Sequence, residues 1–127
     1  MNEIVMIDSS CWIKFLRNSD ENIADLVQSL IQKDLAAICG ITELEVIQGV
    51  KSYKQAEMIK DLFSSLIYYE FSREDFINAG NRIRKLRENG ITLAISDVLI
   101  AELTIRNNLK LLTTDNDFRF IEELVFY

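Results

Sequence analysis

Two kinds of hydrophobic pattern alternate along the chain. Short continuous apolar runs, typical of strands covered on both faces, lie at 4–7, 35–39, 66–71 and 109–113, with a further possible strand at 123–127. Between these runs the apolar residues recur at spacings of three and four, which predicts helices at 9–16, 23–31, 42–49, 53–65, 72–88 and 96–106. Strands separated by helices predict an α/β fold, with a central parallel sheet of about four to five strands and helices on both faces.

Polar residues mark the expected starts of several helices. The candidate caps are Ser9 or Ser10, Thr42, Ser72 and Ser96. Asp75 has the spacing that completes a capping box with Ser72. Thr42 and Glu45 have the same kind of spacing, so Glu45 also has a purely structural interpretation, in which its side chain bonds back to the start of its own helix.

The composition is that of an ordinary globular chain and excludes several kinds of enzyme. With 127 residues, of which 49% are hydrophobic and 27% charged, the chain is expected to form one domain over 1–127. The sequence has no His, which excludes Ser-His-Asp and Cys-His nucleophile systems and any His-ligated zinc site. With only 4 Gly it has no glycine-rich phosphate loop.

The net charge and the cysteines indicate which partners and which cellular compartment to expect. A net charge of −6 argues against a protein that simply coats nucleic acid, although a cation held by clustered acids inverts the local field. Cys11 and Cys39 have apolar neighbours and are expected to be reduced thiols in the core. Because no apolar run has the length of a membrane span and the start lacks a signal peptide, we expect a cytoplasmic protein with no membrane partner.

Acidic side chains recur where predicted strands end and where predicted helices begin. They are Asp8, Glu43, Glu45, Asp97, Asp115 and Asp117. Ligands of parallel α/β sheets bind beyond the carboxyl ends of the strands, so these acids are expected to meet at one edge of the sheet. Clustered carboxylates repel one another, and a hard divalent cation such as Mg²⁺ or Mn²⁺ relieves the repulsion. Such ions, singly or in pairs, promote phosphodiester hydrolysis.

Each acid also has a simpler interpretation. Asp8 can be an ordinary turn residue after a strand, and Asp97 an ordinary first-turn acid favoured by the helix dipole. Asp115 and Asp117 can form an Asx turn that leads into a short helix near Phe118. Each signal is modest by itself, and their joint placement favours a site.

Four segments together resemble a known family. They read IVMIDSSCWIKFL at 4–16, EVIQG at 45–49, LRENG at 86–90 with SDVLIA at 96–101, and LLTTDNDF at 111–118. In this order and spacing they resemble the PIN-domain ribonucleases, specifically the VapC-type toxins of bacterial and archaeal toxin–antitoxin pairs. The resemblance extends over essentially the whole chain and implies a PIN-like fold.

The resemblance implies an Mg²⁺- or Mn²⁺-dependent endoribonuclease that hydrolyses RNA phosphodiester bonds with water activated by the metal. The acids that would act in catalysis and hold the metal are Asp8, Glu45, Asp97 and Asp115, with Asp117 as an additional metal ligand at the edge of the group. Ser10 and Thr113 would orient these carboxylates without binding the metal themselves. Glu45 is preferred over Glu43 because it lies four residues before Gly49, as the motif requires.

The resemblance also implies three partners: an RNA substrate, a second copy of the chain in a homodimer, and a cognate VapB-like antitoxin that blocks the acids, often with a basic side chain. The apolar helices at 12–16 and 23–31 are the expected antitoxin surface, unless they are core. The basic residues of the 72–88 helix are candidates for phosphate contacts, unless they form a solvated face. They are Arg82, Arg84, Lys85 and Arg87.

Two other functions fit parts of the pattern. A catalytically silent PIN-like module would bind RNA or protein without cutting, but four intact acids argue against it. A receiver-type phosphoacceptor domain needs paired acids after the first strand and a Lys after a late strand. Here the only possible partner of Asp8 is Glu3, at the opposite end of the same strand.

Overall fold

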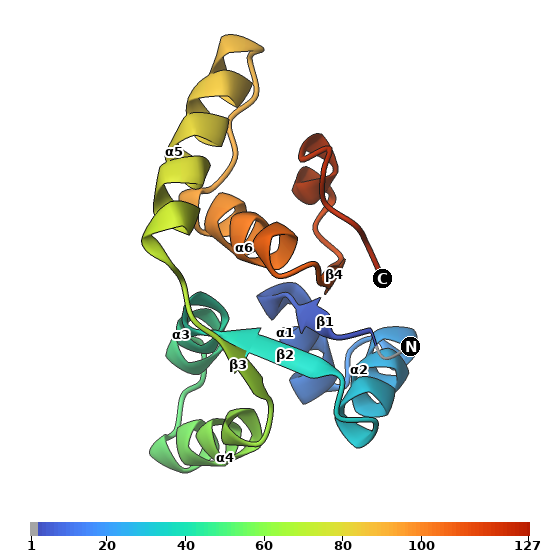
Figure 1. The fold of residues 1–127 in the computed structure, drawn as a ribbon. Coiled ribbons are helices and arrows are strands. Elements are labelled where there is room, and N and C mark those ends of the chain that lie inside the picture. Colours follow the sequence, from blue (N-terminus) through green and yellow to red (C-terminus); the bar gives the residue numbers. More distant parts are fainter. Residues whose placement is uncertain (1–2) are drawn as a thin grey trace.

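The computed structural model describes residues 3–127 and shows a four-stranded parallel sheet (Figure 1). The strands β1 (Val5–Ile7), β2 (Ala36–Cys39), β3 (Ile67–Tyr69) and β4 (Lys110–Leu112) lie in the order β3-β2-β1-β4. The helices are α1 (Ser9–Arg17), α2 (Glu21–Gln32), α3 (Gly40–Gln48), α4 (Tyr53–Ser64), α5 (Arg73–Glu88) and α6 (Ile95–Arg106), followed by the 3₁₀ helix η1 (Asn116–Phe120). The predicted α/β fold is confirmed.

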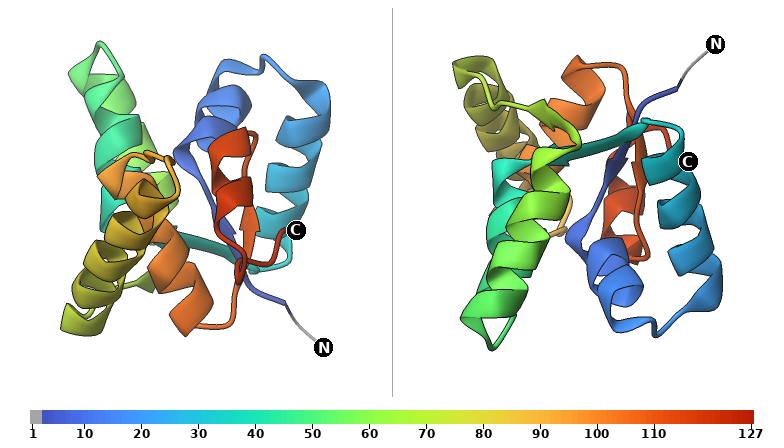
Figure 2. Two further views of the ribbon diagram at one scale, coloured as in Figure 1. Left: turned by 90° about the horizontal axis from the view of Figure 1, so that it is seen from above. Right: turned by 90° about the horizontal axis from the view of Figure 1, so that it is seen from below.

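Each face of the sheet has its own hydrophobic core. Because strand side chains alternate, Val5 and Ile7 pack with helices on one face and Met6 packs on the other. Trp12 and Phe63 belong to the first core, which is formed with α1–α4, while the second is formed with α5, α6 and η1. Figure 1 shows these two layers, and Figure 2 shows that α1 and α2 lie apart from α3 and α4 along the sheet.

The strand order places β1 between β2 and β4. The chain adds β2 and β3 on one side of β1 and then crosses to add β4 on the other side, so β1 and β4 flank the point where the strand order reverses. Asp8 extends this pairing, since its N–H donates to the carbonyl of Leu112 at 2.9 Å. Ligands of open α/β sheets bind at such a switch point, where Asp8 and Thr113 follow the two strands.

The helices α1, α3 and α6 have no side-chain cap at their amino-terminal ends. The caps predicted at Ser9 or Ser10, at Thr42 and at Ser96 are therefore wrong. The N-cap positions belong to Asp8, Cys39 and Ala94, because each helix starts earlier than its polar residue suggested. Glu45 consequently lies beyond the first turn of α3, and its capping-box interpretation is also wrong. By contrast, the capping box of Ser72 and Asp75 is confirmed.

The end of the chain pairs only briefly with the sheet. The strand predicted at 123–127 is reduced to one parallel bridge between Leu111 and Phe126, beside β4.

The two cysteines are free and buried, as predicted. Burial raises the pKa of the Cys11 thiol to about 11 and also raises that of Cys39, so both thiols are unreactive core groups.

The apolar helices near the amino terminus are mostly core. Trp12, Val27 and Leu30 are fully buried, so the expectation that both helices present an apolar partner surface is wrong for these residues. Ile13 and Leu16 of α1 instead line a groove that faces α4. Within residues 3–127, no helix combines the length and the apolar character that a membrane crossing requires.

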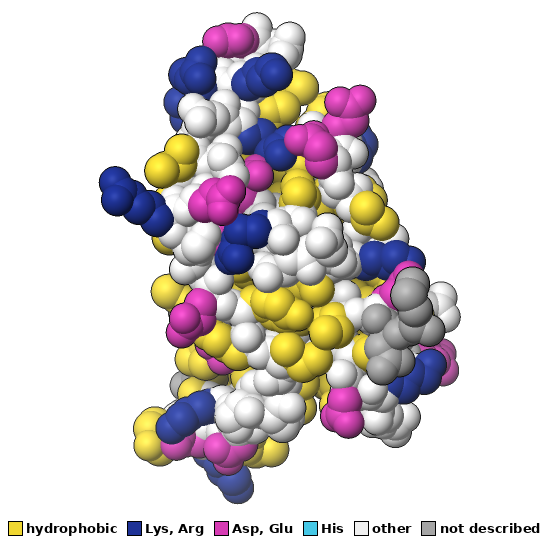
Figure 3. All heavy atoms as spheres, in the orientation of Figure 1, with side chains coloured by type: hydrophobic (Ala, Val, Ile, Leu, Met, Phe, Trp, Pro, Cys, Tyr) yellow, Lys and Arg dark blue, Asp and Glu magenta, His cyan; other side chains and the backbone are white. Residues whose placement is uncertain are grey.

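Arg82 of α5 forms an ion cluster with two glutamates. Its guanidinium binds the carboxylate of Glu102, which is only 6% exposed, and that of Glu123 at 2.9 Å. This ion cluster argues against a phosphate contact by Arg82, because its donors already join α5 to α6 and to the carboxyl-terminal segment. Arg84 pairs with Glu88 along the helix. Figure 3 shows the basic side chains of this region interspersed with acids, which favours a solvated face.

We expect Arg82→Met to lower the free energy of unfolding by about 3 kcal/mol, because the substitution leaves the buried Glu102 carboxylate without a partner. Urea unfolding measures this loss. Arg84→Gln is the matched control and should change stability by less than about 0.5 kcal/mol, since its ion pair is exposed. Weaker RNA binding by Arg82→Met at unchanged stability would instead support a phosphate contact by Arg82.

Candidate metal centre

Asp8 is buried at the end of β1 and leaves one carboxylate oxygen free. The residue is 3% exposed, and its Oδ2 accepts hydrogen bonds from Ser10 Oγ at 2.9 Å and Thr113 Oγ1 at 3.0 Å. Among residues 3–127, Asp8 Oδ1 has no hydrogen-bond partner. Burying an unpaired anionic oxygen is costly, and a cation bound at Oδ1 removes the cost.

The loop between β4 and η1 fixes the two hydroxyls that hold Asp8. The N–H of Thr114 donates to Ser10 Oγ at 3.2 Å, and the N–H of Asp115 donates to Thr113 Oγ1 at 3.0 Å. Each hydroxyl accepts from the backbone and donates its own hydrogen to Asp8 Oδ2. This chain of bonds joins the first and last strands and sets the orientation of the Asp8 carboxylate.

Three further acids form a compact group beside this network. Asp97, Asp115 and Asp117 each offer a carboxylate oxygen, and these oxygens lie within 4.8 Å of one another. Asp115 also caps η1 through a bond from the N–H of Asp117 to its Oδ1 at 2.9 Å, so the predicted Asx turn and the acidic group coexist. Asp117, predicted at the edge, lies inside the group.

Asp97 experiences the crowding of the other acids. Its pKa is raised to about 6, first by burial and then by the charges of Asp8, Asp115, Glu45 and Asp117. Asp97 lies in the first turn of α6, where the helix dipole favours an anion, but burial and repulsion outweigh the dipole. Asp8 and Glu45 are outside the 4.8 Å group, yet they are near enough to act on Asp97.

The two acids of α3 point to different places. Burial raises the pKa of Glu45, the charge of Asp8 raises it further, and the hydroxyls of Ser9 and Ser96 oppose the rise. Burial alone raises the pKa of Glu43, and the Glu43 charge contributes to a raised pKa of Tyr68 on β3. Glu45 therefore faces the other acids, and Glu43 lies toward Tyr68 on the edge strand β3.

This difference leads to a paired mutational test. Glu45→Gln should reduce RNA cleavage by at least about tenfold, because it removes a charge that would help hold the metal, whereas Glu43→Gln should stay within about twofold of wild type. Both rates are measured on the same labelled RNA with Mg²⁺. If Glu43→Gln is inactive and Glu45→Gln is not, the register assigned to α3 is incorrect.

The structure therefore brings the predicted acids to one edge of the sheet, with Ser10 and Thr113 bonded to Asp8. Together these acids form the acidic cluster: Asp8, Glu45, Asp97, Asp115 and Asp117. All of its donors are carboxylate oxygens, which suits a hard divalent cation. Sequence reasoning missed Ser9 and the hydroxyl of Ser96 as neighbours of Glu45, because it interpreted both as helix caps.

Comparison with known families assigns the class of protein. The sequence profile of the PIN domain matches residues 5–124. The chain belongs to the PIN domain family, and the resemblance inferred from the four segments is confirmed.

Individual relatives match nearly the full length of the chain. It is 27% identical over 125 residues to VapC ribonuclease Mb1587 of Mycobacterium bovis and to ribonuclease VapC11 of Mycobacterium tuberculosis, covering 95% of this chain and 93% of each relative. Among solved structures, VapBC2 of Rickettsia felis bound to a promoter DNA fragment matches with a TM-score of 0.81 and 23% identity, over 98% of this chain and 97% of that chain. VapBC-1 of nontypeable Haemophilus influenzae matches with a TM-score of 0.79 and 23% identity, over 98% and 96%. These structures share the fold.

Proposed function

We propose that this protein is an endoribonuclease that depends on Mg²⁺ or Mn²⁺ and acts as the toxin of a toxin–antitoxin pair. One observation carries the proposal: the buried Asp8 has one oxygen saturated by Ser10 and Thr113 and the other without a partner among residues 3–127, beside a compact group of acids. A structural Asp would have both oxygens hydrogen-bonded. An Asp that binds a cation needs one oxygen fixed and one free.

The chain's own residues would hold the ion and position the reaction. Oxygens of Asp97, Asp115 and Asp117, with Asp8 Oδ1, are the proposed ligands, and Glu45 adds charge from α3. When bound, a divalent cation activates water and neutralises the charge that develops on the leaving oxygen. The sequence has no His, so water rather than a His-activated side chain is the proposed nucleophile.

The relatives also support the proposed partners. Proteins named VapC ribonuclease match nearly the full chain, and the matching structures carry titles that name VapBC complexes. We extend both features to this chain: RNA is its substrate, and a VapB-like antitoxin is its inhibitor. A basic side chain of the antitoxin, inserted among the acids, would replace the cation in balancing their charge.

A homodimer stays a prediction. Its best candidate surface surrounds β3, which is an edge strand of the sheet. Large apolar side chains are exposed there on β3 itself (Tyr68), on α3 (Leu44) and on the amino-terminal half of α5 (Phe76 and Ile77). Exposed apolar side chains beside an open strand edge favour association with another chain.

The proposed function is tested with purified, antitoxin-free protein and total RNA in the presence of Mg²⁺. Discrete internal fragments are expected from the wild type, and none from Asp8→Asn purified in parallel, which controls for contaminating nucleases. The absence of fragments with both Mg²⁺ and Mn²⁺, or equal fragments from Asp8→Asn, would overturn the proposal.

A further inference from the structure

The acidic cluster creates an electrostatic problem for an RNA enzyme. The chain has a net charge of −6, and five acids surround the proposed site, so the phosphates on either side of the cut bond are repelled. Single-stranded nucleic acid is commonly held by cations that follow its backbone. A strand that reaches this site therefore needs positive side chains close to the acids.

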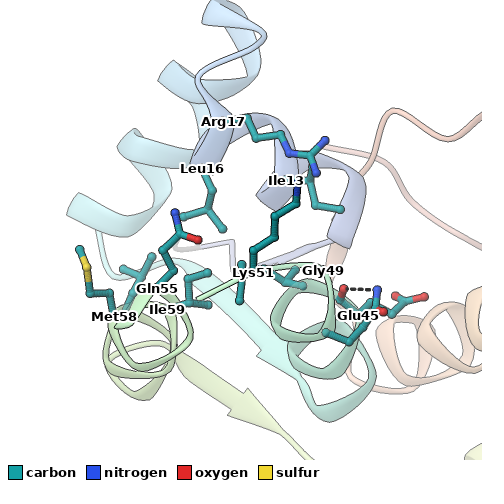
Figure 4. A pocket seen from close by; sticks show the side chains of 13 residues that line it. Ile13, Leu16, Arg17, Glu45, Gly49, Lys51, Gln55, Met58 and Ile59 are labelled. Atoms are coloured by element: carbon teal, nitrogen blue, oxygen red, sulfur yellow. Dashed lines mark hydrogen bonds between the residues drawn. The ribbon is translucent and has the colours of Figure 1, made fainter. Parts of the chain in front are cut away.

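One groove runs from the cluster and contains such side chains. It has a volume of about 810 Å³ and lies between α1 on one side and α3, α4 and their connecting loop on the other (Figure 4). Glu45 belongs both to this groove and to the acidic cluster, so the two are continuous. Ile13, Leu16 and Ile59 give the groove an apolar floor.

Arg17 and Lys51 enter this groove from opposite walls. Arg17 ends α1, and Lys51 lies in the loop after α3. Figure 4 shows both side chains extending toward the same part of the groove. Over the described residues neither forms an ion pair, whereas six of the other twelve basic residues do. Those with carboxylate partners are Lys14, Lys60, Arg82, Arg84, Arg106 and Lys110.

Two cations that converge without an acid between them repel each other, and an anion placed between them removes the repulsion. A phosphate group has the charge and the oxygen acceptors for this position, because Arg and Lys are its usual protein ligands. Along α1, Arg17 is about 13 Å from Asp8 at about 1.5 Å per residue. A phosphate bound there would belong to a nucleotide a short distance from the cut bond on the same strand.

We infer that Arg17 and Lys51 are substrate-positioning residues that clamp a backbone phosphate of the RNA strand next to the acidic cluster. This inference rests on the proposed function. Among the described residues that line the groove none is aromatic, so base stacking contributes little and the contact is tolerant of sequence. The clamp holds the strand, and the acidic cluster cuts it.

The test compares two pairs of charge-removing substitutions in the wild-type chain. The first pair is Arg17→Gln with Lys51→Gln, in the groove. The control pair is Lys33→Gln with Arg73→Gln, two exposed residues outside it that change the net charge equally. Cleavage of a short fluorescein-labelled single-stranded RNA of mixed sequence is measured at several NaCl concentrations. Melting temperatures should be unchanged in both, because all four side chains are exposed.

The groove pair should raise KM about tenfold and leave kcat within about twofold, because the clamp acts on binding rather than on the reacting atoms. The dependence of log(kcat/KM) on log[salt] should become shallower by about 0.7, because the clamp neutralises one phosphate of a single strand. The control pair should leave KM within about twofold of wild type.

Three results would contradict the inference in distinguishable ways. Equal KM values for the groove pair and the control pair, with active wild type, overturn the clamp and leave the nuclease proposal intact. Wild type that cuts no RNA overturns the nuclease proposal and the clamp with it. A groove pair that binds the cognate antitoxin more weakly but RNA equally well assigns the groove to the inhibitor and overturns the clamp.

Discussion

Asp97→Asn is expected to abolish RNA cleavage while making the metal-free protein more stable. Asparagine keeps the size of the side chain but removes one charge and one strong ligand, so cleavage should fall by at least about a hundredfold. In the metal-free protein the same change relieves repulsion, because burial and four neighbouring acids raise the pKa of Asp97 to about 6. Loss of activity together with a gain in stability is expected when an acid of a metal site is substituted. Substitution of an acid with a structural role would instead lower both activity and stability.

The pH dependence of stability has a definite sign. Because the pKa of Asp97 is higher in the folded protein than its ordinary value of 3.8, the folded state binds the proton more tightly. Its contribution is fully present below pH 3.8 and is lost as pH rises through about 6. After a discount for partial exposure, the loss is about 1–2 kcal/mol. Asp97→Asn should remove this slope and raise Tm at neutral pH by about 3–12 °C.

Urea unfolding in EDTA, from pH 3.8 to above about pH 6, measures this pH dependence of stability. Asp25→Asn, an exposed acid of α2, is the control and should keep the wild-type slope. A neutral-pH loss of stability in Asp97→Asn, or an unchanged slope, would show that Asp97 does not carry the repulsion assigned to it.

Removing the divalent cation is expected to have an equally large effect. EDTA should stop RNA cleavage by the wild type, and added Mg²⁺ or Mn²⁺ should restore it, because the chain supplies no His and its candidate site consists of carboxylates. Binding to the folded state alone also stabilises it, by about 2.7 kcal/mol when the ion is at about a hundred times its Kd. The wild-type Tm should therefore rise with added metal in the absence of RNA.

Asp8→Asn should respond much less to the metal, since it removes the free oxygen Oδ1 and the charge that acts on Asp97. Asp25→Asn should show the full rise. Melting curves of the three proteins with EDTA, Mg²⁺ and Mn²⁺ measure these responses. Cleavage that survives EDTA, or an Asp8→Asn protein with the full thermal response, would contradict a metal site at this edge.

Much of the fold could be predicted because it depends on local patterns. The run at 4–7 is apolar at every position since β1 is covered on both faces, and the helix at 72–88 begins at Ser72 with a local capping box. The helix starts at the sheet edge were misplaced for a physical reason. At α1 and α3 the chain turns directly from strand to helix, whereas α6 follows a loop after α5. Ser9, Ser10 and Ser96 contact acids of the cluster instead of capping the backbone. Thr42 is buried beside Cys39.

The sequence by itself determined the strands, the family and the acids that follow the strands, because each depends on a short segment or on the order of segments. Only the tertiary structure decided which partners those residues meet. Arg82 is committed to Glu102 and Glu123, which are 20 and 41 residues away along the chain. Asp8 takes its orientation from Thr113, 105 residues away. Arg17 and Lys51 converge only because α1 packs beside α3. Contacts between distant residues depend on how the elements pack, and no local pattern records that packing.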